Sequence, residues 1–229
     1  MSLTTGHGPL AARPAGRFSA RLPDSLLYVE PHPRRVRGLV AGRAVVDSER
    51  VLLVHRQGQP PTYAFPAPDV LAGDPAPEPA AAGYVRVPWD DIDEWYEEEE
   101  RVLGHPRNPY HRVDCLRGGR SLRVEVAGVV LVDTTDTTGV YETALAPRLY
   151  VSPERVRGDL LRPSGTTSYC AYKGVASYWD AVVADVVTAD VAWSYEDPRP
   201  ECGQIAGMLS FDETRTALTH SLPPPAPLR

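Results

Sequence analysis

The sequence predicts a mainly β protein, with α structure only at its margins, built from two antiparallel units. β-Branched residues alternate with polar ones and are interrupted at Ala-Gly and at Val-Asp-Ser/Thr, a pattern typical of hairpins. Shifting the chain by 86 residues places residues 37–42 over residues 123–128, and residues 46–48 over residues 132–134, without a gap. The two units are therefore predicted to come from an internal repeat.

The two ends of the chain lack the periodicity of a helix or a strand. Residues 1–33 are rich in proline, glycine, arginine and alanine, which predicts a mostly irregular N-terminal arm. Residues 221–229 contain Pro-Pro-Pro-Ala-Pro and predict an extended Pro-rich tail. We expect neither end to carry chemistry.

The first repeat, within residues 34–100, is predicted to be truncated. Ala82-Gly83 corresponds best to Ala206-Gly207, a shift of 124 instead of 86, so the first copy lacks 38 residues. The missing part corresponds roughly to residues 157–205. Residues 117–220 then form the complete second repeat, and any site peculiar to that segment belongs to it alone.

Two segments are predicted to join the repeats. Residues 88–100 place Trp89, Ile92 and Trp95 three residues apart, which predicts a short amphipathic connecting helix with a solvated acidic face. Residues 101–116 are punctuated by proline and predict an extended connector.

The composition argues against a nucleic-acid-binding protein and against a membrane protein. The formal net charge is −6 and no apolar run approaches the ~20 residues of a membrane span, so we expect neither a nucleic-acid partner nor a membrane. Three cysteines without CxxC spacing and an N-terminus without a signal pattern favour a cytoplasmic location. Because cysteines and histidines do not cluster, we expect no metal and no cofactor.

Lys173 is the most informative residue, because the other 23 of the 24 basic residues are arginine. A position that keeps lysine can be one that needs a compact ammonium. Lys173 and Arg148 could hold an anion, while Glu142 as a general base or Cys170 as a nucleophile could provide chemistry. Aromatic walls with polar tips would come from Tyr150, Tyr172, Trp193 and Tyr195. Equally open is a structural role, with a buried Cys170 and a Tyr172–Lys173 pair bracing a hairpin.

Several motifs together resemble the bacterial family described as domain of unknown function 427. They are His105-Pro-Arg-Asn-Pro-Tyr-His-Arg-Val-Asp114, the repeated turns, Cys170-Ala-Tyr-Lys-Gly174 with Ser177-Tyr-Trp179, Ala192-Trp-Ser-Tyr195 and Ile205-Ala-Gly-Met-Leu-Ser-Phe211. The resemblance covers residues 34–220 in tandem form and implies a β-tent-like fold, two antiparallel sheets meeting at an angle, without zinc. Ala171, Ser152 and Arg155 depart from the family's usual residues, which marks either a looser relation or a member with its own substrate.

Two functions are kept as hypotheses. The first is an enzyme of bacterial metabolism, either general or specialised biosynthesis, that acts on a small anionic metabolite by elimination, cyclisation or group transfer. The second is a non-catalytic module that binds a ligand or a partner protein. Contact of Glu142 or Cys170 with Lys173 would favour the enzyme. The sequence leaves the substrate and the choice between homo- and hetero-oligomer open.

Overall fold

The chain forms two compact units in this computed structural model, which describes residues 3–21, 23 and 25–224. The first unit ends at His111 and the second begins at Arg112, so the division falls inside the predicted connector. Among the described residues the only helical elements are short 3-10 turns, and the strand pairs are antiparallel. The predicted mainly β fold is confirmed. No helix in this part of the chain is long and apolar enough to cross a membrane.

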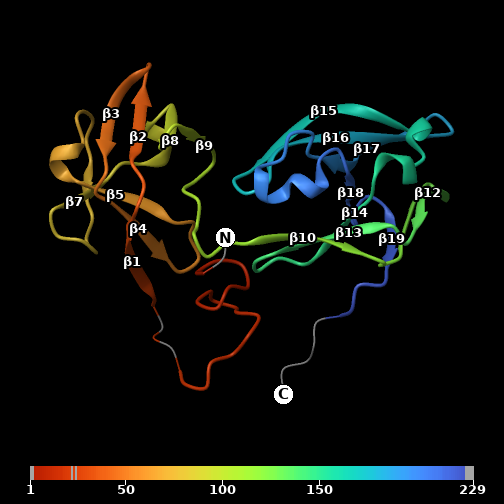
Figure 1. Ribbon diagram of the computed structural model, residues 1–229, viewed down its shortest axis with the longest axis horizontal. Helices are drawn as coiled ribbons and strands as arrows, with labels where there is room; N and C mark the ends of the chain where they lie inside the picture. Colours follow the sequence, from red (N-terminus) through yellow and green to blue (C-terminus); the bar gives the residue numbers. More distant parts are fainter. Residues whose placement is uncertain (1–2, 22, 24, 225–229) are drawn as a thin grey trace. The chain divides into compact units, whose positions relative to one another are not determined.

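The first unit contains two antiparallel sheets, with strand orders β1-β4-β5-β7-β6 and β3-β2-β8-β9 (Figure 1). The strands are β1 (Leu27–His32), β2 (Val36–Val40), β3 (Arg43–Ser48), β4 (Val51–Arg56), β5 (Thr62–Pro66), β6 (Ala76–Pro77), β7 (Tyr84–Arg86), β8 (Glu94–Glu97) and β9 (Glu100–Val102). Residues two positions apart, such as Val51 and Leu53 on β4 or Tyr63 and Phe65 on β5, are buried in one core, where Val36, Val46, Leu53 and Phe65 are fully enclosed. Alternation with a period of two therefore specifies which face of each strand is inside.

The second unit contains three sheets, with orders β10-β13-β14, β12-β11-β19 and β15-β16-β17-β18. The strands are β10 (Val113–Gly118), β11 (Leu122–Val126), β12 (Val129–Thr134), β13 (Thr137–Glu142), β14 (Arg148–Tyr150), β15 (Leu161–Cys170), β16 (Gly174–Val183), β17 (Val186–Ser194), β18 (Leu209–Phe211) and β19 (Ala217–His220). In Figure 1 the long strands β15 to β17 form one layer of this unit and β10 and β13 form another. The candidate site lies where residues of these two sheets meet.

The two units share part of their strand order. β1-β4-β5 and β3-β2-β8 in the first unit correspond to β10-β13-β14 and β12-β11-β19 in the second. Val46 bridges Val70 and, 86 residues later, Val132 bridges Val156. The hairpin turns also agree, since Ala41 and Ala127 have φ of 49° and 48° and each is followed by a glycine with positive φ. The repeated segments therefore have the same local backbone.

The units differ in the segment that comes after the shared strands. Between β14 and β18 the second unit inserts β15, β16 and β17, whereas the first unit has only the two-residue β6 between β5 and β7. These inserted strands lie within residues 157–205, the segment that the repeat offset predicts to be absent from the first copy. The insertion supplies the second unit with an additional sheet.

The predicted connecting helix over residues 88–100 is wrong. Trp89–Asp91 forms a single 3-10 turn, and β8 and β9 come next as a hairpin that turns at Glu98, whose φ is 51°. Trp89, Ile92 and Trp95 do share one core, as their spacing predicts. The backbone is extended because β8 pairs with β2, where Gly38 lies opposite Trp95 and a Cβ on residue 38 would lie only 2.7 Å from Val46 Cγ1.

The irregular N-terminal arm is also shorter than predicted. Residues 3–21 contain only bends and turns, but β1 within the predicted arm pairs along its whole length with β4. A proline at position 31 does not prevent this pairing, because β1 is an edge strand. Residues 221–224 of the predicted tail have no regular structure, and residues 225–229 lie outside the described residues.

Glu97 gives the first unit a stability that depends on pH. Its buried carboxylate accepts a hydrogen bond of 2.6 Å from the Tyr63 hydroxyl, pairs with Arg34, and lies 3.3 Å from His32 Nε2. Burial raises the pKa of Glu97, but the hydrogen bonds from His32, Tyr63 and Arg34 outweigh it and lower the pKa to about 2. Between pH 4.5 and 2 the unfolded chain therefore binds more protons than the folded chain.

We predict that stability falls as the pH is lowered from 4.5 towards 2, and that Glu97→Gln flattens this dependence. At pH 7 the variant should lose about 3 kcal/mol of unfolding free energy, because Arg34, His32 and Tyr63 lose a buried partner. Urea unfolding across this pH range measures both effects. Glu100→Gln, on an exposed residue of the same hairpin, is the control. An unchanged slope in Glu97→Gln would contradict the assignment.

Candidate functional site

A cavity of about 320 Å³ lies in the second unit, bounded by strands of two sheets. Val140 and Glu142 come from β13, and Arg148 and Tyr150 come from the adjacent β14. On each strand the two residues are two apart, so their side chains lie on the same face. The rest of the lining is Leu145, Ala146, Lys173, Tyr178, Trp193, Tyr195 and Asp212. Six of the eight residues predicted for the site line this cavity.

Lys173 occupies the turn between β15 and β16, where Cys170 pairs with Gly174. Gly174 has a φ of 105°, and an added Cβ would lie 3.3 Å from the carbonyl oxygen of Asp197. A residue with a side chain would be strained at this position. The turn therefore depends on glycine to direct the preceding lysine towards the cavity.

The ammonium of Lys173 forms an ion pair with Glu142, the last residue of β13. The side chains are only 11% and 9% exposed, so both charges are largely removed from water. Burial lowers the pKa of Lys173, but the neighbouring Cys170 and the charge and hydrogen bond of Glu142 outweigh it, so the pKa is raised. The lysine is therefore a cation at neutral pH and not a free amine.

Aromatic residues form one wall of the cavity. Tyr178 on β16 and Trp193 on β17 are cross-strand neighbours, so they present their side chains to the same face. The Trp193 indole N–H donates to the Tyr150 hydroxyl at 2.9 Å, and the two rings meet edge to face. The Arg148 guanidinium lies over the Trp193 ring, 5.8 Å from its centroid. Through these contacts Trp193 on β17 is linked to Tyr150 and Arg148 on β14.

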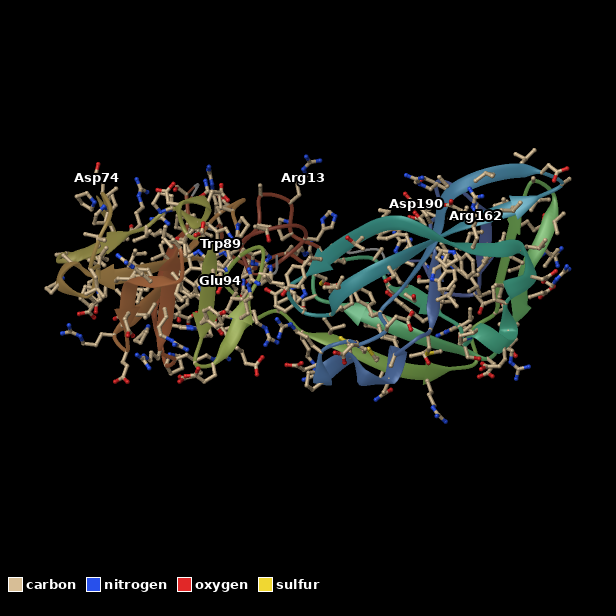
Figure 2. All side chains as sticks on the ribbon, turned by 90° about the horizontal axis from the view of Figure 1, so that it is seen from above. Arg13, Asp74, Trp89, Glu94, Arg162 and Asp190 are labelled. Carbon is tan, nitrogen blue, oxygen red and sulfur yellow. The ribbon has the colours of Figure 1, made fainter. Side chains whose placement is uncertain are left out.

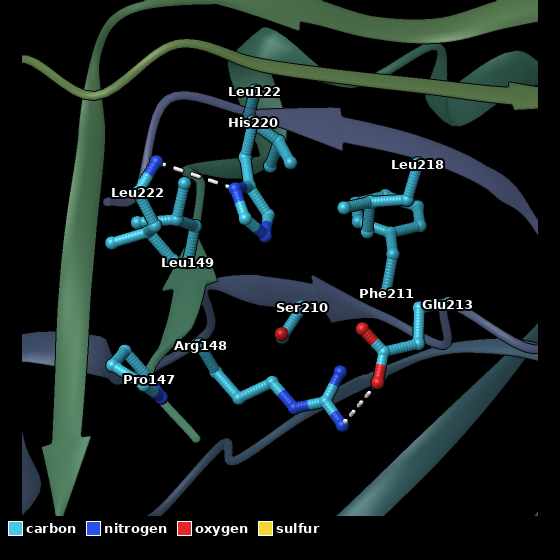
Figure 3. Close-up of a pocket in the computed structure, with 10 residues that line it drawn as sticks. All are labelled: Leu122, Pro147, Arg148, Leu149, Ser210, Phe211, Glu213, Leu218, His220 and Leu222. Carbon is cyan, nitrogen blue, oxygen red and sulfur yellow. Dashed lines mark hydrogen bonds and ion pairs between the residues drawn. The ribbon is translucent and has the colours of Figure 1, made fainter. Parts of the chain in front are cut away.

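Arg148 is held at the edge of the cavity. Its Nη2 lies 3.3 Å from Glu213 Oε1. Arg148 and Glu213 also line a second, smaller cavity of about 20 Å³, and Figure 3 shows their ion pair there. Both side chains of this ion pair are partly exposed, so the pair is weak and can exchange for another anion. A ligand carboxylate or phosphate could therefore replace Glu213 as the partner of Arg148.

Two tyrosines in the cavity remain protonated. Burial raises the pKa of Tyr150, although its hydrogen bond from Trp193 acts in the opposite direction, and burial also raises the pKa of Tyr195. The Tyr150 hydroxyl accepts from Trp193 and keeps its own proton to donate. Within the described residues the Tyr195 hydroxyl makes no hydrogen bond, although this residue is only 5% exposed. Both phenols are thus candidate donors to a ligand.

Cys170 and Tyr172, the other two predicted site residues, do not line the cavity. Cys170 packs against a core cluster that includes Cys115, Tyr150 and Cys202, and Tyr172 is buried with its carbonyl 3.7 Å from the Cys202 thiol. These positions agree with the structural alternative for the two residues. They remove the geometric basis for attack by Cys170 on a ligand in the cavity.

The sequence reasoning missed Tyr178 and Asp212. Tyr178 is placed by strand pairing with Trp193, which a single sequence does not reveal. Asp212 comes directly after β18 and accepts hydrogen bonds from the backbone and side chain of Thr214. Burial raises the pKa of Asp212, but these bonds outweigh it and lower the pKa. An Asx turn at Asp212-Glu-Thr214 would have been the only sequence signal.

Among the described residues, no group of three or more His, Cys, Asp or Glu side chains is placed to hold a metal ion. The three cysteines are not joined by disulfides.

The second unit is thus a mainly β domain in which an inserted sheet encloses a cavity rich in hydrogen-bond donors. Residues 114–220, slightly less than half of the chain, match the family described as domain of unknown function (DUF427). The resemblance deduced from the motifs is confirmed over these residues. The first unit lies outside the match, so its membership of the same family stays a prediction. No curated protein matches the chain.

The single lysine allows a direct test of the buried ion pair. Labelling with 15N-lysine gives one side-chain signal, and we predict that Lys173 titrates above its ordinary pKa of 10.5. In Glu142→Gln the pKa should fall, because the loss of the carboxylate leaves burial to dominate. The variant should also lose about 3 kcal/mol of unfolding free energy at pH 7.

Glu213→Gln is the matched control, since it removes a carboxylate that pairs with Arg148 and not with Lys173. Because the folded pKa of Lys173 is raised, the stabilisation by the pair is fully present below pH 10.5 and is lost as the pH rises further. A Lys173 pKa that is the same in the wild type and in Glu142→Gln would refute the pair.

Proposed function

We propose that the second unit is an enzyme that binds a small anionic metabolite in its cavity and transfers protons through Lys173 and Glu142. The observation that carries this proposal is the set of donors on one cavity: Arg148, Lys173, Tyr150 and Tyr195. The acceptors there already have partners, since Glu142 pairs with Lys173 and Asp212 with Thr214. A ligand that supplies oxygen acceptors and negative charge would complete the site.

The aromatic wall adds a preference for a ligand with a planar or apolar body. Tyr178 and Trp193 provide a ring surface next to the guanidinium of Arg148. A carboxylate at Arg148 would place the rest of the ligand against these rings. The volume of about 320 Å³ is at the lower end of the range for small-molecule sites, which favours a small metabolite.

The ion pair suits acid–base chemistry better than covalent chemistry. An elimination, a cyclisation and a group transfer each need one proton removed and another supplied, and a carboxylate beside an ammonium can do both. The raised pKa of Lys173 opposes attack by a free amine, which a Schiff base would need. We therefore assign Glu142 as the base and Lys173 as the acid and anion ligand.

The first unit favours a second candidate function, a binding module without catalysis. Arg56, the last residue of β4, makes a partly buried ion pair with Glu78 at 2.6 Å, and β4 corresponds to β13, which ends at Glu142. The first unit therefore also has an ion pair at this strand end, but there the strand carries the cation and in the second unit it carries the anion. If Lys173–Glu142 has the same structural role, the cavity binds its ligand and does not transform it.

The three cysteines, which form no disulfide, support a cytoplasmic setting for either function.

Ligand binding can be tested before the reaction is known. Any molecule that binds the folded state raises the melting midpoint, so a library of small carboxylates and phosphates can be screened by thermal shift. We predict that Arg148→Gln abolishes the shift that a bound anion gives the wild type. Arg157→Gln is the matched control, because Arg157 also makes an exposed ion pair, with Asp159, but does not line the cavity. Equal shifts in both variants would contradict the site.

Catalysis is then tested on a ligand found in that screen. Glu142→Gln and Lys173→Arg are each incubated with it, and its conversion is followed by NMR spectroscopy. If the site is an enzyme, we predict that the wild type converts the ligand and that Glu142→Gln slows conversion by about 100-fold or more. Lys173→Arg should keep the charge but lose activity, because a planar guanidinium cannot occupy the same point. Binding without conversion by the wild type would select the binding module instead.

A further inference from the structure

The first unit contains a cavity of about 370 Å³ that the proposed function does not use. One side is formed by residues 59–63, which lead into β5, and another by Val87, Trp89 and Asp90 around the 3-10 turn. Trp95 on β8 and residues 104–106 complete the lining. This volume is within the range that holds a small organic ligand.

Three aromatic rings line this cavity as a continuous group. Trp89 stacks on Trp95 with centroids 5.3 Å apart, and Tyr63 lies 5.7 Å from Trp95 and 6.4 Å from Trp89. Trp95 and Tyr63 are buried, whereas Trp89, labelled in Figure 2, is partly exposed. Of the three rings, Trp89 is therefore the one that solvent reaches.

The polar atoms of the two buried rings, Trp95 and Tyr63, have partners within the fold. The Trp95 indole N–H donates to the Trp89 carbonyl at 3.1 Å, and the Tyr63 hydroxyl donates to Glu97. A ligand would therefore meet the rings mainly through their π systems. A π face carries partial negative charge and attracts cations, and indole is the strongest of the side-chain rings in this respect.

The charged groups of the lining favour the same kind of ligand. Asp90 is an exposed carboxylate at the edge of the cavity, and no lysine or arginine is among the described residues that line it. Burial lowers the pKa of His105, so this side chain is neutral at pH 7. The lining therefore combines aromatic surface with one negative charge.

From this combination we infer that the cavity of the first unit binds an organic cation of the alkylated ammonium class. The alkyl groups contact Trp89, Trp95 and Tyr63, while the positive charge lies towards Asp90. The cavity of the second unit has the opposite character, with Arg148 and Lys173 in its lining. The two sites select ligands of opposite charge, so each can be tested independently of the other.

Choline and its neutral carbon isostere 3,3-dimethyl-1-butanol separate charge from shape, because the two molecules differ mainly in the nitrogen. Titration of the full chain is followed through the indole N–H signals of its four tryptophans. We expect choline to shift the signals of Trp89 and Trp95 saturably and to leave those of Trp179 and Trp193 unchanged. The butanol should bind about tenfold more weakly, because it lacks the cation–π attraction.

Asp90→Asn and Asp91→Asn make the same charge change on neighbouring exposed residues, of which only Asp90 lines the cavity. We expect Asp90→Asn to weaken choline binding about fivefold and Asp91→Asn to leave it nearly unchanged. Equal binding of choline and the butanol, equal effects of the two variants, or no saturable shift of Trp89 and Trp95 would each overturn the inference. Melting midpoints of the variants verify that both fold.

Discussion

The enclosed ion pair between Lys173 and Glu142 connects the inserted sheet to the rest of the second unit. Removing either charge from water costs several kcal/mol, so the pair is tolerated only while the two groups remain in contact. Contact requires the turn between β15 and β16 to lie at the end of β13. The turn is therefore held in place because an unpaired buried charge would be costly. This position of the turn also sets one boundary of the cavity.

The cavity of the second unit is bounded in part by strands that have no counterpart in the first unit. The first unit has the corresponding sheets without β15 to β17, and its core is closed by Phe65, Trp95 and their neighbours. In the second unit the inserted strands bring Tyr178 and Trp193 opposite β13 and β14. Polar groups on those strands that would otherwise face water become the lining of a pocket. The strands that the two units share carry Glu142, Arg148 and Tyr150, and the additional strands carry Tyr178 and Trp193.

Much of the candidate site could be predicted because its residues occur in pairs two positions apart. Arg148 and Tyr150, like Trp193 and Tyr195, lie on one face of an extended chain, and the rarity of lysine drew attention to Lys173. Tyr178 and Asp212 could not be predicted, since pairing between distant strands places them there. Cys170 and Tyr172 lie at the turn between β15 and β16 and do not line the cavity, although Lys173 of the same turn does.

The incorrect prediction of a connecting helix has a similar cause. Residues three apart, such as Trp89, Ile92 and Trp95, satisfy the spacing of a helix, and a turn followed by a strand satisfies it equally well. Only the pairing of Trp95 with Gly38 on β2 decides between them, and this contact joins residues far apart in the chain. Local pattern therefore identified the buried residues correctly but not the backbone that carries them.

The scarcity of lysine has a consequence for covalent modification of the protein. The only ε-amino group in the sequence is paired with a carboxylate and shielded from solvent, so the folded surface offers no lysine side chain for acylation or for conjugation to a carrier protein. An amine-directed reagent too large to enter the cavity would reach Lys173 only when the tip of the β15–β16 hairpin opens. The extent of its acylation would therefore report how often that hairpin leaves the end of β13.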